Sequence, residues 1–104
     1  LKMNFANLVQ QAQQMQKKVA KAKKEFDEKE FDIVSQNDII TGKIKGNLEI
    51  TELHIEQSMM SIEHQEDVQD LLMITLNQMI KKINNEREDT VNKVTNGVDV
   101  SAFL

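Results

Sequence analysis

The stretch FDIVSQNDIITGKIKGNLEITELHIE, residues 31–56, decides the fold because its apolar residues alternate with polar ones. Alternation is the pattern of a strand with one buried face, whereas a helix repeats every three or four residues. Two turn signals interrupt the alternation, Gln36-Asn37-Asp38 and Gly46-Asn47. The stretch therefore predicts a three-stranded antiparallel meander, with strands over about 31–35, 39–45 and 48–56.

The third of these strands has an irregular pattern. Its apolar positions change parity, from Leu48 and Ile50 to Leu53 and Ile55. A β-bulge near Thr51 would bring both pairs to one face, since a bulge adds one residue to one strand only. The alternative is that both faces of this strand are partly covered.

A helical period precedes the meander and predicts a helix over about residues 4–30. Asn4 suits its N-cap. Apolar residues recur at steps of three and four, which is a heptad seam for packing against another helix. They are Phe5, Leu8, Ala12, Met15, Val19, Ala22 and Phe26.

The helical period returns after the meander and predicts a second helix over about 63–95, followed by a short tail over 96–104. An acidic group lies early and a basic group late, which complements the helix dipole; the groups are Glu63, Glu66, Asp67 and Asp70, and Lys81, Lys82, Arg87 and Lys93. Between Leu71 and Ile83 it has too many apolar residues for one stripe, so more than one side must be covered. The C-terminal end of this helix, where apolar residues are sparse, is called its thin end. The thin end and the seam of the first helix can pack on each other, or on the same elements of a partner chain. The 104 residues thus predict a single α+β domain of order α-β-β-β-α.

Composition excludes several classes of protein. There is no cysteine, which excludes disulfides, thiolate metal sites and a cysteine nucleophile. No run approaches a membrane span of about 20 apolar residues, and Leu1-Lys2 before Met3 suggests that Met3 is the natural first residue. His54 and His64 have no convergent set of ligands. We therefore expect no enzyme, no catalytic or metal-binding residue, no cofactor and no small-molecule substrate; a metal-dependent enzyme would need an ion bound at His54 or His64.

Charge is segregated along the chain, although the net charge is only −4. A lysine block, with Lys23 on the flank of the seam and the others off it, precedes an acidic block. A charge run is commonly a solvated helix face, but solvated faces usually mix the two signs at i,i+4 spacing. The first block comprises Lys17, Lys18, Lys21, Lys23 and Lys24, and the second comprises Glu25, Asp27, Glu28, Glu30 and Asp32.

Five segments together resemble the YbaB/EbfC family of nucleoid-associated proteins, in register over nearly the whole chain. They are QQAQQMQKK (10–18), KGN (45–47), ITELHIEQSMM (50–60), EDVQDLLMITLNQMIKK (66–82) and VTNGVDVSAFL (94–104). The resemblance implies an α-β-β-β-α protomer, a homodimer whose paired helices project like tweezers, and binding to DNA in the bacterial nucleoid. The chain departs from the family at Leu48, where a second glycine is frequent, at Gln57 in place of a proline, and at Ser101-Ala102 in place of Pro-Gly.

We therefore predict a cytoplasmic, nucleoid-located homodimer, without membrane attachment, that binds double-stranded DNA with weak sequence specificity. Lysines without neighbouring aromatic residues suit phosphates better than bases. The alternative is a protein–protein adaptor that holds its partner with coiled-coil arms, and whose apolar contacts would depend little on salt. The first-choice DNA contacts are Lys17, Lys18, Lys21 and Lys24, and the second-choice contacts are Lys81 and Lys82. Phe31, Ile33, Val34, Leu71 and Ile74 are the candidates for the core and dimer surface.

Overall fold

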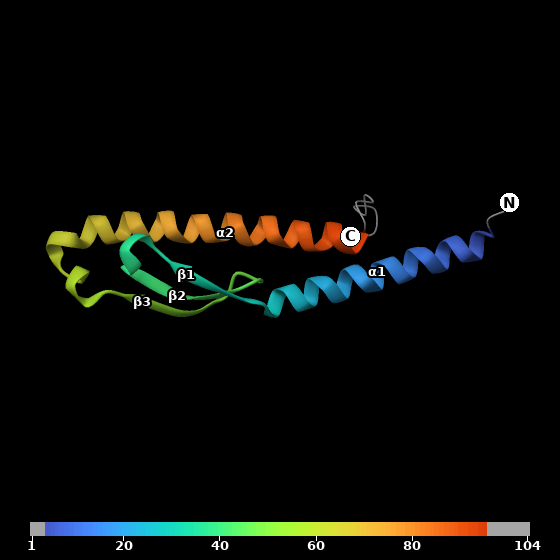
Figure 1. The fold of residues 1–104 in the computed structure, drawn as a ribbon, viewed down its shortest axis with the longest axis horizontal. Helices are drawn as coiled ribbons and strands as arrows, with labels where there is room; N and C mark the ends of the chain where they lie inside the picture. Colours follow the sequence, from blue (N-terminus) through green and yellow to red (C-terminus); the bar gives the residue numbers. More distant parts are fainter. Residues whose placement is uncertain (1–3, 96–104) are drawn as a thin grey trace.

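The chain forms a rod 73 Å long and 18 by 17 Å in cross-section (Figure 1). The computed structural model describes residues 4–95, so Leu1-Lys2, Met3 and the expected tail at 96–104 lie outside the described residues. The elements are α1 (Phe5–Glu28), β1 (Glu30–Val34), β2 (Ile40–Lys45), β3 (Ile50–Ile55) and α2 (Gln65–Thr95). Short 3-10 turns occupy Gln36–Asp38, Gln57–Met59 and Ile62–His64. The order confirms the predicted α-β-β-β-α fold.

Helix α1 begins at a capped end. The Asn4 side-chain oxygen accepts a hydrogen bond from the Ala6 N–H at 3.0 Å, which satisfies one of the free donors of the first turn. The prediction of Asn4 as N-cap is thus confirmed. The helix ends where Lys29 adopts an extended backbone, and the chain passes directly into β1.

The three strands form an antiparallel sheet in the order β1-β2-β3. Lys43 pairs with Glu52, but the next residue, Ile44, pairs with Ile50, so Thr51 is an additional residue in β3. The bulge expected near Thr51 is therefore confirmed. It turns Ile50 and the later apolar residues of β3 toward the same face, because directly opposed residues share a face.

The turn between β2 and β3 is longer than the two residues Gly46-Asn47 that the sequence suggested. Leu48 belongs to it, with a left-handed φ of 73°, and its N–H donates to the Lys45 carbonyl at 2.8 Å. Three-residue hairpin loops commonly place their third residue in this region. Glycine adopts it without strain, but a leucine does not. Leu48 thus keeps the backbone conformation expected of a glycine, and β3 begins only at Ile50.

Helix α2 runs along one face of the sheet (Figure 1), and the hydrophobic core lies between the two. We call the sheet and the part of α2 that packs on it the head. The core residues come from all layers: Phe26 of α1, Phe31 and Ile33 of β1, Ile40 and Ile44 of β2, and Met79 and Ile83 of α2. Burial of these side chains is the main stabilising contribution to the head.

Candidate nucleic-acid interface

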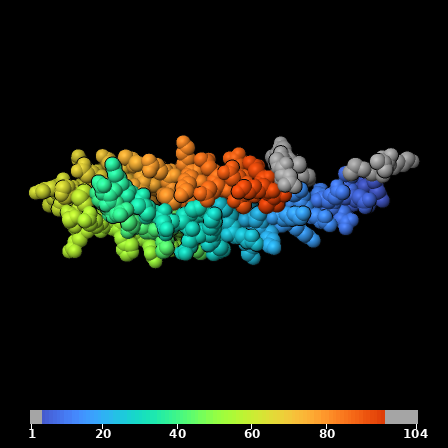
Figure 2. All heavy atoms as spheres, in the orientation of Figure 1, coloured from blue at the N-terminus to red at the C-terminus, as the bar shows by residue number. Residues whose placement is uncertain are grey.

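Helix α1 is an arm over residues 5–24. It runs antiparallel to α2, and its N-terminal half extends past the end of the described part of α2 (Figures 1 and 2). The seam is buried only near the head, at Val19 and Phe26, whereas Phe5 is 78% exposed. The structure therefore covers one half of the predicted heptad seam and leaves the other half open.

The first-choice lysines are all exposed on this arm. Within the described residues, the only ion pair that any of them makes joins Lys21 to Glu25, at 3.9 Å between two exposed side chains. An exposed pair of this kind is worth little and is easily exchanged for another partner. Lys17, Lys18, Lys21 and Lys24 can therefore offer their charge to an external anion.

The lysines of the sheet differ from those of the arm. Lys43 donates to Asp32 at 3.2 Å and Lys45 donates to Glu28 at 3.1 Å. These hydrogen bonds and the charges of the two carboxylates raise the pKa of both lysines. Because each ammonium has a carboxylate partner, the sheet offers much less free positive charge than the arm does.

A groove between α1 and α2 adds two lysines that the sequence alone did not single out. Its larger part, about 460 Å³, is lined by Lys29 and Lys93 and by the apolar Phe26 and Val94. The adjoining part, about 330 Å³, is lined by Lys18 and Lys21 with Ala22, Glu25 and Val94. The groove thus brings the last turn of α2 beside the arm lysines. The expected contact of the seam with the thin end of α2 was the signal that could have identified Lys93.

The remaining predicted residues lie elsewhere. Lys81 and Lys82 are exposed on α2, about 17–18 Å along the helix from Lys93 at 1.5 Å per residue. Phe31 and Ile33 are buried in the core, and Leu71 packs against it. Val34 and Ile74 are 55% and 54% exposed, so the core of a single chain does not include them.

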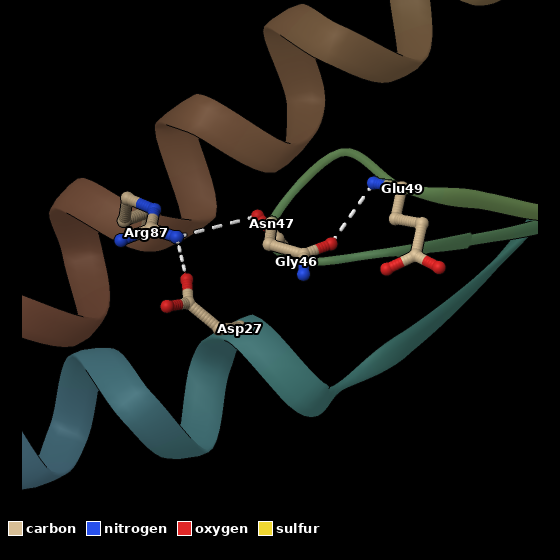
Figure 3. Close-up of polar contacts among 5 residues, drawn as sticks. All are labelled: Asp27, Gly46, Asn47, Glu49 and Arg87. Atoms are coloured by element: carbon tan, nitrogen blue, oxygen red, sulfur yellow. Dashed lines mark hydrogen bonds and ion pairs between the residues drawn. The ribbon is translucent and has the colours of Figure 1, made fainter.

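The arm meets the head at a joint made by residues 26–29 at the end of α1, the turn residues 46–47, and residues 86–87 of α2. Arg87 forms an ion pair with Asp27 and donates to the Gly46 carbonyl at 3.4 Å (Figure 3). Its guanidinium also lies 5.3 Å from the centre of the Phe26 ring. Beside it, Lys29 pairs with Glu86 at 3.7 Å. The joint therefore connects the end of α1 to both the β2–β3 turn and α2.

The head carries the opposite charge to the arm. Residues 46–80 contain no lysine or arginine, whereas residues 5–24 contain no acidic residue. The acidic residues of the first segment are Glu49, Glu52, Glu56, Glu63, Glu66, Asp67 and Asp70. The two ends of the rod therefore have opposite sign, and the net charge of −4 does not describe the arm.

The two histidines do not belong to this surface. His54 is exposed on β3 and His64 is half-buried in the turn before α2. Over residues 4–95, no group of three histidine, cysteine or acidic side chains is placed to hold a metal ion. None of the helices in that same range is both long and apolar enough to cross a membrane.

Comparison with known proteins agrees with a nucleic-acid interface on this chain. Over residues 2–98 the chain matches the model of the YbaB/EbfC DNA-binding family. A nucleoid-associated protein of Clostridium novyi is 34% identical over 98% of this chain and 90% of its own length. One of Enterococcus faecalis is 33% identical over 91% of each chain.

A solved structure supports the fold. The crystal structure of an uncharacterized protein from Helicobacter pylori superposes with a TM-score of 0.76, over 90% of this chain and 99% of that one. Its sequence identity is 21%, so the likeness concerns the fold alone. The family match extends over nearly the whole chain, and it is a match to DNA-binding proteins rather than to enzymes. This chain belongs to the YbaB/EbfC family of nucleoid-associated, DNA-binding proteins.

Proposed function

We propose that this protein works as a homodimer that holds double-stranded DNA between its arms, mainly through phosphate contacts, with weak sequence specificity. The bacterial relatives are named nucleoid-associated proteins, and we place this chain in the nucleoid, inside the cytoplasm. The observation that carries the proposal is the exposed lysine set of the arm, Lys17, Lys18, Lys21 and Lys24.

Phosphate contact is favoured over base reading by the chemistry of the arm. Lysine is a flexible point charge, which suits the phosphate backbone and carries no sequence information directly. Stacking on bases would need aromatic side chains, and Phe5 is the only one within residues 5–24. Lys93 and Lys29 at the groove add charge where the arm joins α2. Lys81 and Lys82 are secondary contacts in this proposal.

The homodimer is favoured by apolar surface that one chain leaves open on the head. Ile74 and Met73 of α2 are more than half exposed, and so is Val34 at the end of β1. At the end of the head, Met60 and Ile62 line a hollow of about 480 Å³ with other apolar residues. Exposed apolar patches of this kind mark protein interfaces. A second copy on the head would leave the arms of both chains free for DNA.

The experiment compares two variants with the same change in net charge. One replaces Lys17, Lys18, Lys21 and Lys24 with glutamine; the control replaces Gln36, Gln57, Ser58 and Gln78, which are exposed on or near the head, with glutamate. Affinity for random duplex is measured by gel shift at several salt concentrations. Light scattering on the same samples reports the mass, expected at about twice the 12.0 kDa chain.

We expect the parent's log affinity to fall with log salt at a slope of roughly −5 to −7, for about six to eight phosphates neutralised per dimer. The lysine variant should bind every duplex far more weakly and with a shallower slope, and it should stay dimeric. The control should bind nearly as the parent does. Equal binding by the lysine variant and the parent would mean that the four arm lysines do not contact DNA and are only a solvated helix face. It would favour an adaptor that uses the exposed apolar stripe of Phe5, Leu8 and Val9.

A further inference from the structure

Few side chains of α1 are fully buried. Between Phe5 and Glu28 only Val19 and Phe26 are buried. Ala22 and Glu25 of α1 also line the groove with Val94 of α2, and the ion pairs to α2 lie at the joint, where α1 ends. The N-terminal part of α1 projects beyond these contacts, so its direction depends on how firmly the contacts near the C-terminal end hold the helix.

The β2–β3 turn closes the end of α1 by hydrogen bonds. The Gly46 N–H donates to the Lys29 carbonyl at 2.8 Å, and the Asn47 N–H donates to the Asp27 carbonyl at 3.3 Å. Carbonyls in the last turn of a helix have no partner within the helix, so the turn supplies one. A side chain at Gly46 would collide with the Phe26 carbonyl, so glycine is required for this close approach.

Arg87 holds these two segments to α2 at the same time. Its guanidinium pairs with Asp27 of α1, donates to the Gly46 carbonyl of the turn, and faces the Phe26 ring. Figure 3 shows that Arg87 reaches from α2 toward both segments. Arginine suits this place because its planar group can donate in several directions and stack on a ring; lysine has no such plane.

We propose that Arg87 positions the arm: through Asp27 and the Gly46 turn it fixes the angle of α1 to the head, and thereby the spacing of the two lysine arms that grip DNA. This inference rests on the proposed function. Arg87 need not touch DNA in this role. Its removal should weaken binding because a loosely held arm must be ordered when DNA binds.

Two variants with opposite charge changes separate positioning from electrostatics. Arg87→Met removes a positive charge, whereas Asp27→Ala removes a negative one. If charge alone mattered, the second variant would bind the phosphate backbone more tightly than the parent. If the joint positions the arm, both should bind roughly tenfold more weakly. The matched controls are Lys43→Met and Asp32→Ala, which break an ion pair on the sheet away from the arm.

The arm angle is measured directly on the same proteins. The chain has no cysteine, so spin labels can be placed at Gln13→Cys on the arm and Asn84→Cys on α2, both exposed positions. Labelled chains diluted with unlabelled ones report the distance within one chain by pulsed electron resonance. We expect a narrow distribution in the parent and the controls, a broad one in Arg87→Met and Asp27→Ala, and an intermediate one in Arg87→Lys. Circular dichroism confirms that each variant is folded.

The results distinguish this inference from the proposed function. Tighter DNA binding by Asp27→Ala, or distributions as narrow as the parent's, would overturn the positioning role. If Arg87→Met does not fold, Arg87→Lys and Asp27→Ala decide the question. A parent that does not bind DNA would overturn the proposed function. The distance measurement would then still decide whether Arg87 holds the arm.

Discussion

The head and the arm differ in how much of their apolar surface is buried. In the head, two faces of apolar side chains close on each other, and Ile33, Ile40 and Ile83 are completely buried. In the arm, a single helix carries a seam that is covered at one end and open at the other. The head therefore contributes most of the free energy of unfolding. The properties of the arm depend mainly on its charge and on its attachment to the head.

The difference shows how a small acidic protein can belong to a DNA-binding family. Electrostatic attraction to DNA depends on the charge near the phosphates, because salt screens charges beyond about 8–10 Å. The rod is 73 Å long, so acidic residues of the head at its far end oppose the arm only weakly. In a compact domain of the same composition the acidic residues would lie closer to the lysines. The rod keeps the acidic head away from the DNA that the lysine arm would bind.

The largest change in the free energy of unfolding is expected for a substitution at Ile83, in the core of the head. Replacing this fully buried residue with alanine should lower the free energy of unfolding by about 3 kcal/mol, through lost burial and a remaining cavity. Urea unfolding followed by circular dichroism, at a fixed protein concentration, measures the change. A loss below about 1 kcal/mol would mean that the head does not carry the stability.

A smaller effect is expected at Leu48, at the turn that closes the joint. Leu48→Gly should raise the free energy of unfolding by about 0.5–1 kcal/mol, because glycine adopts the left-handed φ of 73° without strain. Leu48→Ala serves as control, since it keeps the strained conformation and should give no gain. A glycine variant no more stable than the alanine variant would show that this turn is not strained.

The smallest effect is expected on the open part of the arm. Leu8→Ala removes an exposed seam residue and retains good helix propensity, so the free energy of unfolding should change by less than about 0.5 kcal/mol. The same urea titration measures it beside Ile83→Ala. A cost approaching that of Ile83→Ala would mean that Leu8 is covered in solution, by the arm of a second copy.

The sequence predicted most of the fold because the local patterns agree with the tertiary packing. Alternation located the strands, and the parity change at Leu53 predicted the bulge at Thr51. The capping preference of asparagine located the start of α1 at Asn4. The ends of β3 and the left-handed Leu48 were not predicted, since turn length depends on how the hairpin docks on α1.

The candidate site was only partly predictable. Local periodicity was enough to place Lys17, Lys18, Lys21 and Lys24 off the seam. It could not show that Lys93 lines the same groove, because that depends on which turns of α1 and α2 lie side by side. Arg87 was missed for the same reason, since its partner Asp27 is 60 positions away. Val34 and Ile74 have apolar character without burial in one chain, and sequence patterns do not distinguish a core residue from an interface residue.

The joint also has a consequence for the order of events during synthesis. The ribosome adds Asp27 to the chain 60 residues before Arg87. Translation proceeds at about 5–20 residues per second, so for several seconds the nascent arm has neither α2 nor its arginine. The arm lysines leave the ribosome before Arg87, and under our proposal they acquire a fixed direction only once Arg87 is in place. Helix α1 is thus synthesised before the residue that we propose positions it.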